Sequence, residues 1–329
     1  MSTNILNRID LNKNDSFILM AKEDLGSVLN QIDCFDLFLR SNINMSKNDT
    51  FGFEIEFESK DIYEINIELD KYFRDDWKLE NDGTIPYGGE VITPILYDSF
   101  STWFEISDVC EILKKYATIG ESCGGHIHIG NQMIEDECNF INFIKVWLAF
   151  EDVIFRFSFG EYLYYRENIL RYAMPLAKNI LKNKKKLDLN LLLRMVNYTS
   201  MDAIHLKGKK FDMFNVDNTI EFRCPNGTLN PIIWQNNLNL FINLLNYSKN
   251  KYNDMLIKYI ISNNMKKYNE YDISDYELMN MYSKIDIDKA FLLCDAIFDN
   301  NLDKLYFLKQ YFKDFEEAKI YKKSKKFTK

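Results

Sequence analysis

The chain has 329 residues, a formal net charge of −8 and a sequence pI of about 5.2. This charge balance argues against a nucleic-acid partner, because neutralising phosphates takes clustered lysine and arginine side chains. Hydrophobic residues make up 47% of the sequence, which predicts a folded globular protein and excludes a disordered one.

The sequence also predicts a cytoplasmic protein that contacts no membrane. Its first residues are polar and lack the apolar core of a signal peptide, and no stretch approaches the roughly 18 apolar residues of a membrane span. The six cysteines are scattered without CxxC spacing, as expected for reduced thiols. Two lysine-rich runs, 182–186 and 319–329, are interpreted as solvated segments rather than binding sites.

Glycine and proline divide the chain into three parts. Gly26 is the one glycine before residue 50, and neither residue type occurs after Pro231. Because long helices exclude glycine and proline, this pattern predicts a helical N-terminal lead, a middle part rich in strands and turns, and a helical C-terminal extension. The expected boundaries of the three parts are 1–50, 51–248 and 249–329.

The spacing of apolar residues predicts an α+β fold with an antiparallel sheet flanked by helices. Apolar residues at helical spacing predict helices at 16–40, 98–117, 137–158 and 231–247, and again beyond residue 250. Strict alternation predicts half-buried strands at 51–58, 125–130 and 219–224. A further apolar strand is expected to begin at Glu90, after a double glycine.

Alternation in the first strand, FGFEIEFE, gathers acidic side chains on one face. Its aromatic residues and Ile55 face the core, whereas Glu54, Glu56 and Glu58 face the other way, each about 7 Å from the next. Like charges in a row destabilise a strand. Such a face is either solvated or the binding site of a cation, and this strand alone leaves both interpretations open.

Two later strands repeat this arrangement. In GHIHIG, His126 and His128 share one face, where they could be metal ligands, phosphate contacts or ordinary surface residues. In TIEFRC, Glu221 and Arg223 share one face, as an exposed ion pair or as a cation ligand beside a phosphate-binding guanidinium.

Together these strands predict one polar sheet face. An oxygen-rich set of ligands with one or two imidazoles suits Mg²⁺ or Mn²⁺, and four glutamates exceed what one Mg²⁺ usually takes. Metal ions beside an arginine suggest a nucleoside triphosphate, held by metals and side chains because no Walker A or GxGxxG sequence occurs. The residues expected on this face are Glu54, Glu56, Glu90, His126, His128, Glu221 and Arg223.

Four segments, in this order, resemble the amidoligase family of the glutamine synthetase and γ-glutamylcysteine ligase superfamily. They are FGFEIEF, NDGTIPYGGEVITPIL, CGGHIHIG and TIEFRCPNGTLNP, and RENILRYAMPL is a weaker match. The resemblance covers residues 51–231 and implies a curved antiparallel sheet of glutamine synthetase-like catalytic type. It also implies an ATP-dependent ligase that joins a carboxylate to an amine through an acyl phosphate.

The resemblance further implies roles for individual residues, with ATP and Mg²⁺ (or Mn²⁺) as cofactors. By their positions in the motifs, the metal ligands are Glu54, Glu56, Glu90, His126 and Glu221. His128 is expected to face phosphates or substrate, and Arg223, Arg166 and Arg171 are expected to bind the nucleotide. The expected partners are small-molecule or peptide carboxylates and amines, and a homo-oligomer is expected because related ligases often assemble.

A base must also deprotonate the attacking amine, because an amine is mostly cationic near pH 7. Glu58 and Asp82 are the candidates for this base. His205 and Lys207, expected in a loop before the last strand, are interpreted mainly as surface residues and only secondarily as further contacts.

Two other functions remain open at this point. Cys123 precedes His126 by three residues, and a Cys–His pair could catalyse acyl transfer or hydrolysis. The chain could also be a catalytically inactive ligase fold that serves as a binding module.

Overall fold

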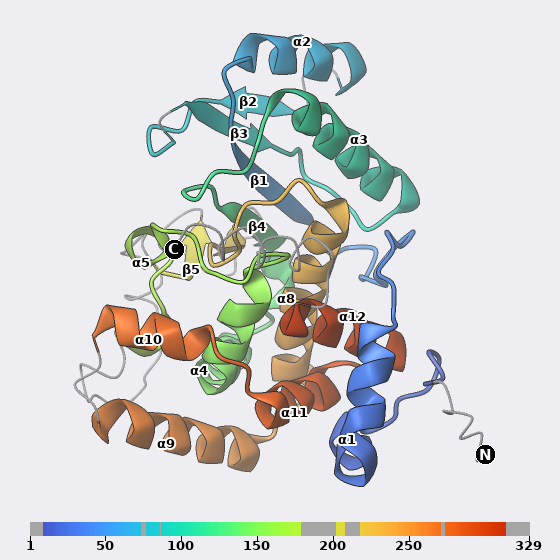
Figure 1. Ribbon diagram of the computed structural model, residues 1–329, viewed down its shortest axis with the longest axis vertical. Helices are drawn as coiled ribbons and strands as arrows, with labels where there is room; N and C mark the ends of the chain where they lie inside the picture. Colours follow the sequence, from blue (N-terminus) through green and yellow to red (C-terminus); the bar gives the residue numbers. More distant parts are fainter. Residues whose placement is uncertain are drawn as a thin grey trace.

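The computed structural model describes residues 9–73, 77–85, 87–178, 202–207, 218–270 and 274–313. In these residues one six-stranded open sheet runs through the molecule in the order β2-β3-β1-β4-β6-β5, and every neighbouring pair is antiparallel (Figure 1). The strands are β1 (Phe51–Glu58), β2 (Lys78–Glu80), β3 (Gly88–Ile92), β4 (Gly125–Gly130), β5 (Ile204–Lys207) and β6 (Thr219–Phe222).

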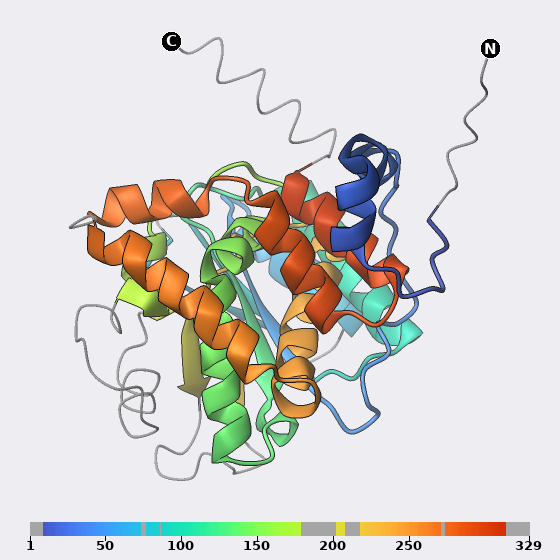
Figure 2. The same cartoon turned by 90° about the horizontal axis from the view of Figure 1, so that it is seen from below.

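Helices bury the apolar face of this sheet. They are α3 (Phe100–Tyr116), α4 (Glu137–Ser158) and α8 (Pro231–Asn250), of which α4 and α8 lie side by side against the sheet (Figures 1 and 2). The rings of Phe53 and Trp234 have their centroids 4.8 Å apart, and Phe222 stacks on Phe241 at 4.1 Å. Aromatic packing of this kind holds one sheet face in the core and leaves the polar side chains on the other.

Capping residues set where these helices begin. The side chains of Ser99, Asp136 and Asn230 each accept a backbone N–H of the first turn of α3, α4 and α8. Pro231 then occupies the first turn of α8, where its missing N–H costs no hydrogen bond. The helices predicted at 98–117, 137–158 and 231–247 are therefore confirmed, as is an α+β fold with an antiparallel sheet.

The N-terminal helix packs against the C-terminal helices. Helix α1 (Phe17–Asp33) lies beside α11 (Ile287–Ile297) and α12 (Asn301–Phe312) in Figure 2. The carboxylate of Asp295 accepts hydrogen bonds from Ser16 Oγ and from the first N–H groups of α1. Helices α9 (Asp254–Glu270) and α10 (Asp275–Tyr282) pack on α4, so the C-terminal helices are joined to the helical layer under the sheet.

Some elements differ from the sequence prediction. The helical pattern of 16–40 ends at Asp33, and helix α2 (Ile62–Phe73) and strands β2 and β5 were not predicted. His205 and Lys207 lie on β5, paired with β6, and not in a loop. The described residues also include the short helices α5 (Ile169–Tyr172) and η2 (Asn131–Met133).

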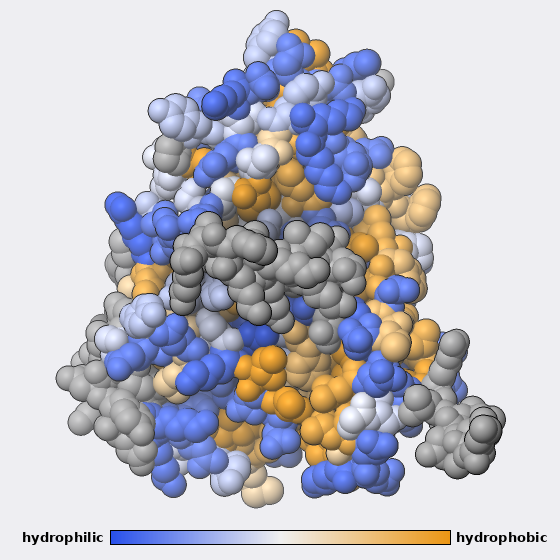
Figure 3. All heavy atoms as spheres, viewed as in Figure 1, coloured by the Kyte–Doolittle hydropathy of each residue, from blue (hydrophilic) through white to orange (hydrophobic). Residues whose placement is uncertain are grey.

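The surface drawn in Figure 3 is largely hydrophilic, with apolar side chains gathered below its centre. Among the described residues, no helix combines the length and apolar character that crossing a bilayer requires.

Candidate active site

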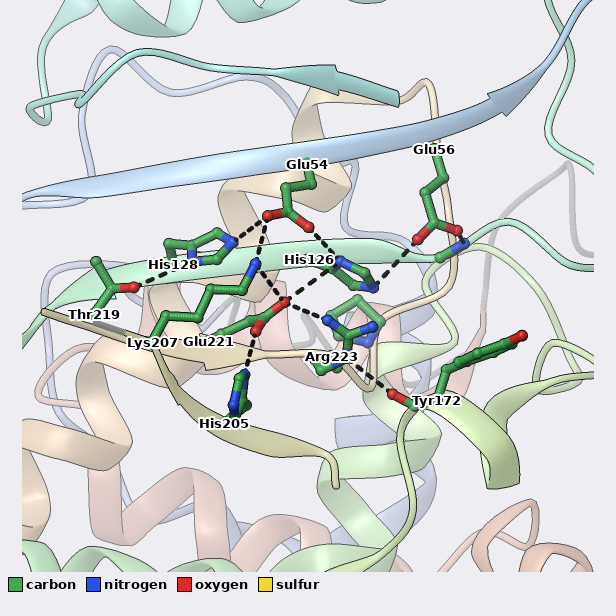
Figure 4. A network of polar contacts seen from close by, with 12 residues as sticks. Glu54, Glu56, His126, His128, Tyr172, His205, Lys207, Thr219, Glu221 and Arg223 are labelled. Atoms are coloured by element: carbon green, nitrogen blue, oxygen red, sulfur yellow. Dashed lines mark hydrogen bonds and ion pairs between the residues drawn. The ribbon is translucent and has the colours of Figure 1, made fainter. Parts of the chain in front are cut away.

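Strand register brings the polar residues of four strands together. Glu54 of β1 lies opposite His126 of β4, and Glu56 lies opposite Glu90 of β3. His128 of β4 lies opposite Glu221 of β6. Because directly opposed residues point to the same face, these side chains converge on one side of the sheet, as Figure 4 shows for most of them.

The first cluster consists of Glu54, His128 and Glu221, whose ligand atoms all lie within 4.8 Å of one another. His128 Nε2 is 3.0 Å from Glu54 Oε1, and Nδ1 is 3.2 Å from the hydroxyl of Thr219, which orients the ring. Glu221 has no exposed surface. Two carboxylates and an imidazole arranged in this way are a suitable donor set for a divalent metal.

The second cluster consists of Glu56, Asp82 and Glu90, also within 4.8 Å of one another. Asp82 belongs to a turn in which its own carboxylate accepts the N–H of Thr84. Burial and the charges of Glu54, Asp82 and Glu56 raise the pKa of Glu90 to about 7. Three converging carboxylates repel one another unless a cation neutralises them, and an all-oxygen set suits Mg²⁺ or Mn²⁺.

His126 connects the two clusters. Its Nδ1 lies 2.6 Å from Glu54 Oε2, and its Nε2 lies 3.3 Å from Glu56 Oε1. Burial alone would raise the pKa of Glu54, but the hydrogen bonds with His126 and His128 hold that pKa well below its usual range. The histidine pair therefore favours ionised carboxylates at the point where the clusters meet.

Basic side chains contact the first cluster. Lys207 Nζ lies 2.8 Å from Glu54 Oε1 and 3.3 Å from Glu221 Oε1. Arg223 reaches Glu221 Oε1 at 2.5 Å, and its Nε donates to the carbonyl of Tyr172 at 2.9 Å. Burial alone would raise the pKa of the Glu221 carboxyl. The hydrogen bond with His205 and the charges of His126 and Arg223 nevertheless keep that pKa below its usual range.

A cavity of about 340 Å³ is lined by Glu54, His126, Arg223 and the three carboxylates of the second cluster. Arg166 is buried in its wall and donates to the carbonyls of Arg223 and Pro225. Only glycine fits at position 124, because a Cβ there would lie 1.3 Å from the Arg166 guanidinium. The lining residues are Glu54, Glu56, Asn81, Asp82, Gly83, Thr84, Glu90, Ser122, His126, Arg166, Tyr172 and Arg223.

A second cavity, of about 420 Å³, shares Arg166 with the first. Three tyrosines and two exposed glutamates, Glu121 and Glu167, give it a partly aromatic and acidic wall. The other lining residues are Ile119, Gly120, Cys123 and Asn226, and the tyrosines are Tyr162, Tyr164 and Tyr165.

Two of the residues predicted from the sequence, Glu58 and Arg171, belong neither to the first cavity's wall nor to the two clusters. Glu58 occupies the space beside Gly120, where a Cβ would meet its carboxylate. Arg171 is exposed, with its guanidinium over the ring of Tyr172 at 5.2 Å. All other predicted residues line the first cavity or belong to the first cluster: Glu54, Glu56, Asp82, Glu90, His126, His128, Arg166, Glu221 and Arg223.

Several residues at the site could not be predicted from side-chain patterns. Tyr172 contributes its backbone carbonyl, and a pattern of side chains cannot predict which backbone groups take part in a site. Thr84 and Ser122 lie in turns and Asn81 in an irregular segment, where periodicity carries no information. Lys207 does take part in the site, and its alternation with His205 in the IHLK sequence of β5 is the signal that could identify a further polar strand.

The geometry disfavours a cysteine nucleophile. Burial raises the pKa of the Cys123 thiol to about 12, so little thiolate is present near pH 7. Cys123 lines the second cavity, whereas His126 lines the first and has its ring nitrogens next to Glu54 and Glu56. The Cys–His pair required for acyl transfer is therefore not formed.

Comparison with known proteins identifies one matching family. A family model described as "Putative amidoligase enzyme" matches residues 48–245. The match includes every strand of the described sheet and both carboxylate clusters. No match was found among curated proteins.

Proposed function

Because the chain belongs to the amidoligase family, we propose that it is an ATP-dependent ligase that joins a carboxylate to an amine. The observation that carries this proposal is the pair of ligand clusters on one sheet face, where the second cluster, Glu54 and Arg223 line the same cavity. A ligase of this type needs cations to neutralise a triphosphate and a fixed donor to stabilise the transferring phosphoryl group. The glutamine synthetase-like character of the sheet is part of the same proposal.

The donor sets suit divalent cations. Glu56, Asp82 and Glu90 would hold one Mg²⁺, and the oxygens and imidazole of the first cluster offer a second position. Bound there, Mg²⁺ would withdraw charge from the phosphate oxygens and make the γ-phosphoryl group easier to transfer.

In the proposed reaction, a carboxylate oxygen of the substrate attacks the γ-phosphorus, and the bond to the ADP oxygen breaks. The amine nitrogen then attacks the acyl carbon, its proton is lost, and phosphate leaves with the acyl oxygen. Arg223 is oriented for the first step by Glu221 and the Tyr172 carbonyl, which fix its planar guanidinium at the cavity wall. A guanidinium held in advance stabilises phosphoryl charge without reorganising during the reaction.

The second cavity is the proposed acceptor site. An amine is mostly an ammonium ion near pH 7 and would be attracted by Glu121 and Glu167, which have no ion-pair partner among the described residues. Of the two candidate bases, Glu58 packs against Gly120, which lines this cavity, whereas Asp82 belongs to the second cluster. We therefore propose that Glu58 accepts the proton of the amine. Asp82 would instead help to hold the cation that neutralises the phosphate charge.

The test is an assay of ADP and phosphate release with Mg²⁺, ATP and a panel of carboxylates and amines. Glu54→Gln and Glu221→Gln should each abolish release, whereas Glu23→Gln, an exposed residue of α1, should not. Full activity in both site variants would show that the chemistry takes place elsewhere. Metal-dependent ATP binding without turnover under any condition would favour the inactive binding module.

A further inference from the structure

The two clusters differ in the cations that they already contact. The Nζ atom of Lys207 lies 2.8 Å from Glu54 and 3.3 Å from Glu221, both members of the first cluster. Arg223 contacts the same Glu221. Within the described residues, no lysine or arginine forms an ion pair with the second cluster, Glu56, Asp82 and Glu90.

Counting charges separates the clusters further. Glu54 and Glu221 are balanced by Lys207 and Arg223, so the first cluster is close to neutral as it stands. The second cluster brings three carboxylates together, and among the described residues its basic contact is His126, whose Nε2 lies 3.3 Å from Glu56 Oε1. The electrostatic free energy of binding a divalent ion is therefore most favourable at the second cluster, where no lysine or arginine already compensates the carboxylates.

An ammonium and a metal ion exclude each other in the first cluster. Lys207 Nζ is within hydrogen-bond distance of the oxygens that a metal would need. Mg²⁺ binds such oxygens at about 2.0–2.1 Å and would then lie next to a positive charge. The lysine side chain is 40% exposed, so it can withdraw toward solvent without unfolding the strand.

We propose that Lys207 acts as a built-in cation of the first cluster, so that the resting protein binds one divalent ion, in the second cluster. The first cluster accepts a metal only when the Lys207 ammonium is removed or displaced. This inference rests on the proposed function for the identity of the metal sites, but it concerns their occupancy rather than the reaction.

The test counts Mn²⁺ ions on the full chain, without nucleotide, by isothermal titration calorimetry and by the loss of the free-ion electron paramagnetic resonance signal. The wild type should bind about one Mn²⁺, and Lys207→Met, which keeps the side-chain length and removes the charge, should bind about two. Lys258→Met is the matched control, because Lys258 is an exposed lysine paired with Asp254 on α9. It should bind Mn²⁺ like the wild type.

A second variant assigns the ions to their clusters. Adding Glu90→Gln to the wild type should remove its tight ion, whereas adding it to Lys207→Met should leave one ion, in the first cluster. Circular dichroism of each variant confirms that it is folded.

Equal Mn²⁺ counts in the wild type and Lys207→Met, whether one or two, would overturn the role of Lys207 and leave the ligase proposal standing. No bound Mn²⁺ in any of the proteins would overturn both this inference and the metal sites of the proposed function.

Discussion

Replacing Glu90 by glutamine separates two effects of the second cluster on stability: repulsion between its carboxylates without metal, and stabilisation by a bound metal ion. Glu90 lies directly opposite Glu56, and the carboxylate of Asp82 completes the group. Without metal, this arrangement of like charges should destabilise the fold, and Glu90→Gln should relieve the repulsion. With metal, the same carboxylate should be a ligand, and Glu90→Gln should lose the stabilisation that the ion provides.

The magnitude follows from the pKa of Glu90, which burial and the neighbouring carboxylates raise from 4.5 to about 7. Converted in full, this difference would correspond to about 3 kcal/mol, but Glu90 is only partly buried, and solvent screening reduces it to about 1 kcal/mol. Because the folded pKa is the higher one, this contribution favours folding fully below pH 4.5 and is lost as the pH rises to about 7.

The assay is thermal unfolding at pH 5 and pH 8, in EDTA and in MgCl₂, with Glu23→Gln as an exposed control. In EDTA at pH 8, Glu90→Gln should melt about 1–3 °C above the wild type, and the difference should vanish at pH 5. In MgCl₂ the wild type should gain stability and the variant should gain much less. If Glu90→Gln is less stable in EDTA, or if Mg²⁺ stabilises both proteins equally, the second cluster is not a repulsive metal site.

Three further predictions concern other parts of the molecule. The double variant Glu121→Gln, Glu167→Gln should raise the KM for the amine roughly tenfold in the ligase assay, because the ammonium loses its charged partners. The KM for ATP should stay unchanged. An unchanged KM for the amine would contradict the acceptor role of the second cavity. Cys123→Ser should keep full activity, since its buried thiol has no base, and a large loss that alkylation reproduces would revive the thiol mechanism. Glu151→Ala should lower the free energy of unfolding by about 3 kcal/mol, because four donors lose their shared acceptor: Trp147 Nε1, Tyr282 Oη and two backbone N–H groups. A denaturant titration that shows no change in this free energy would contradict the prediction.

The polar sheet face could be predicted because alternation along a strand is a local property. Glu54 and Glu56 had to face away from Phe53 and Ile55, and the same reasoning placed His126 and His128 together. The helices that cover the opposite face were predictable for the same reason, since their periodicity and caps lie within short stretches of sequence.

Register was not predictable, because it depends on residues distant in the chain. Nothing near Glu56 indicates that it pairs with Glu90, or that a turn brings Asp82 to both. The short strands β2 and β5 span only three and four residues, too few for periodicity to identify. The contact of Lys207 with Glu54 therefore follows from the sheet and not from the sequence around either residue.

Glu58 shows the limit of reasoning from alternation. It shares its strand face with Glu54 and Glu56, as predicted, but it lies at the end of β1, where the chain from Thr118 to Gly120 passes beside it. Its carboxylate therefore packs against Gly120 rather than lining the cavity with the other two.

The central claim, that the polar sheet face binds divalent cations beside a nucleotide, is tested most directly by anomalous diffraction from crystals soaked with Mn²⁺ and a non-hydrolysable ATP analogue. We predict an Mn²⁺ peak coordinated by Glu56, Asp82 and Glu90, with the triphosphate next to it and in contact with Arg223. A bound nucleotide that lies away from this face, with no Mn²⁺ between the three carboxylates, would contradict the claim.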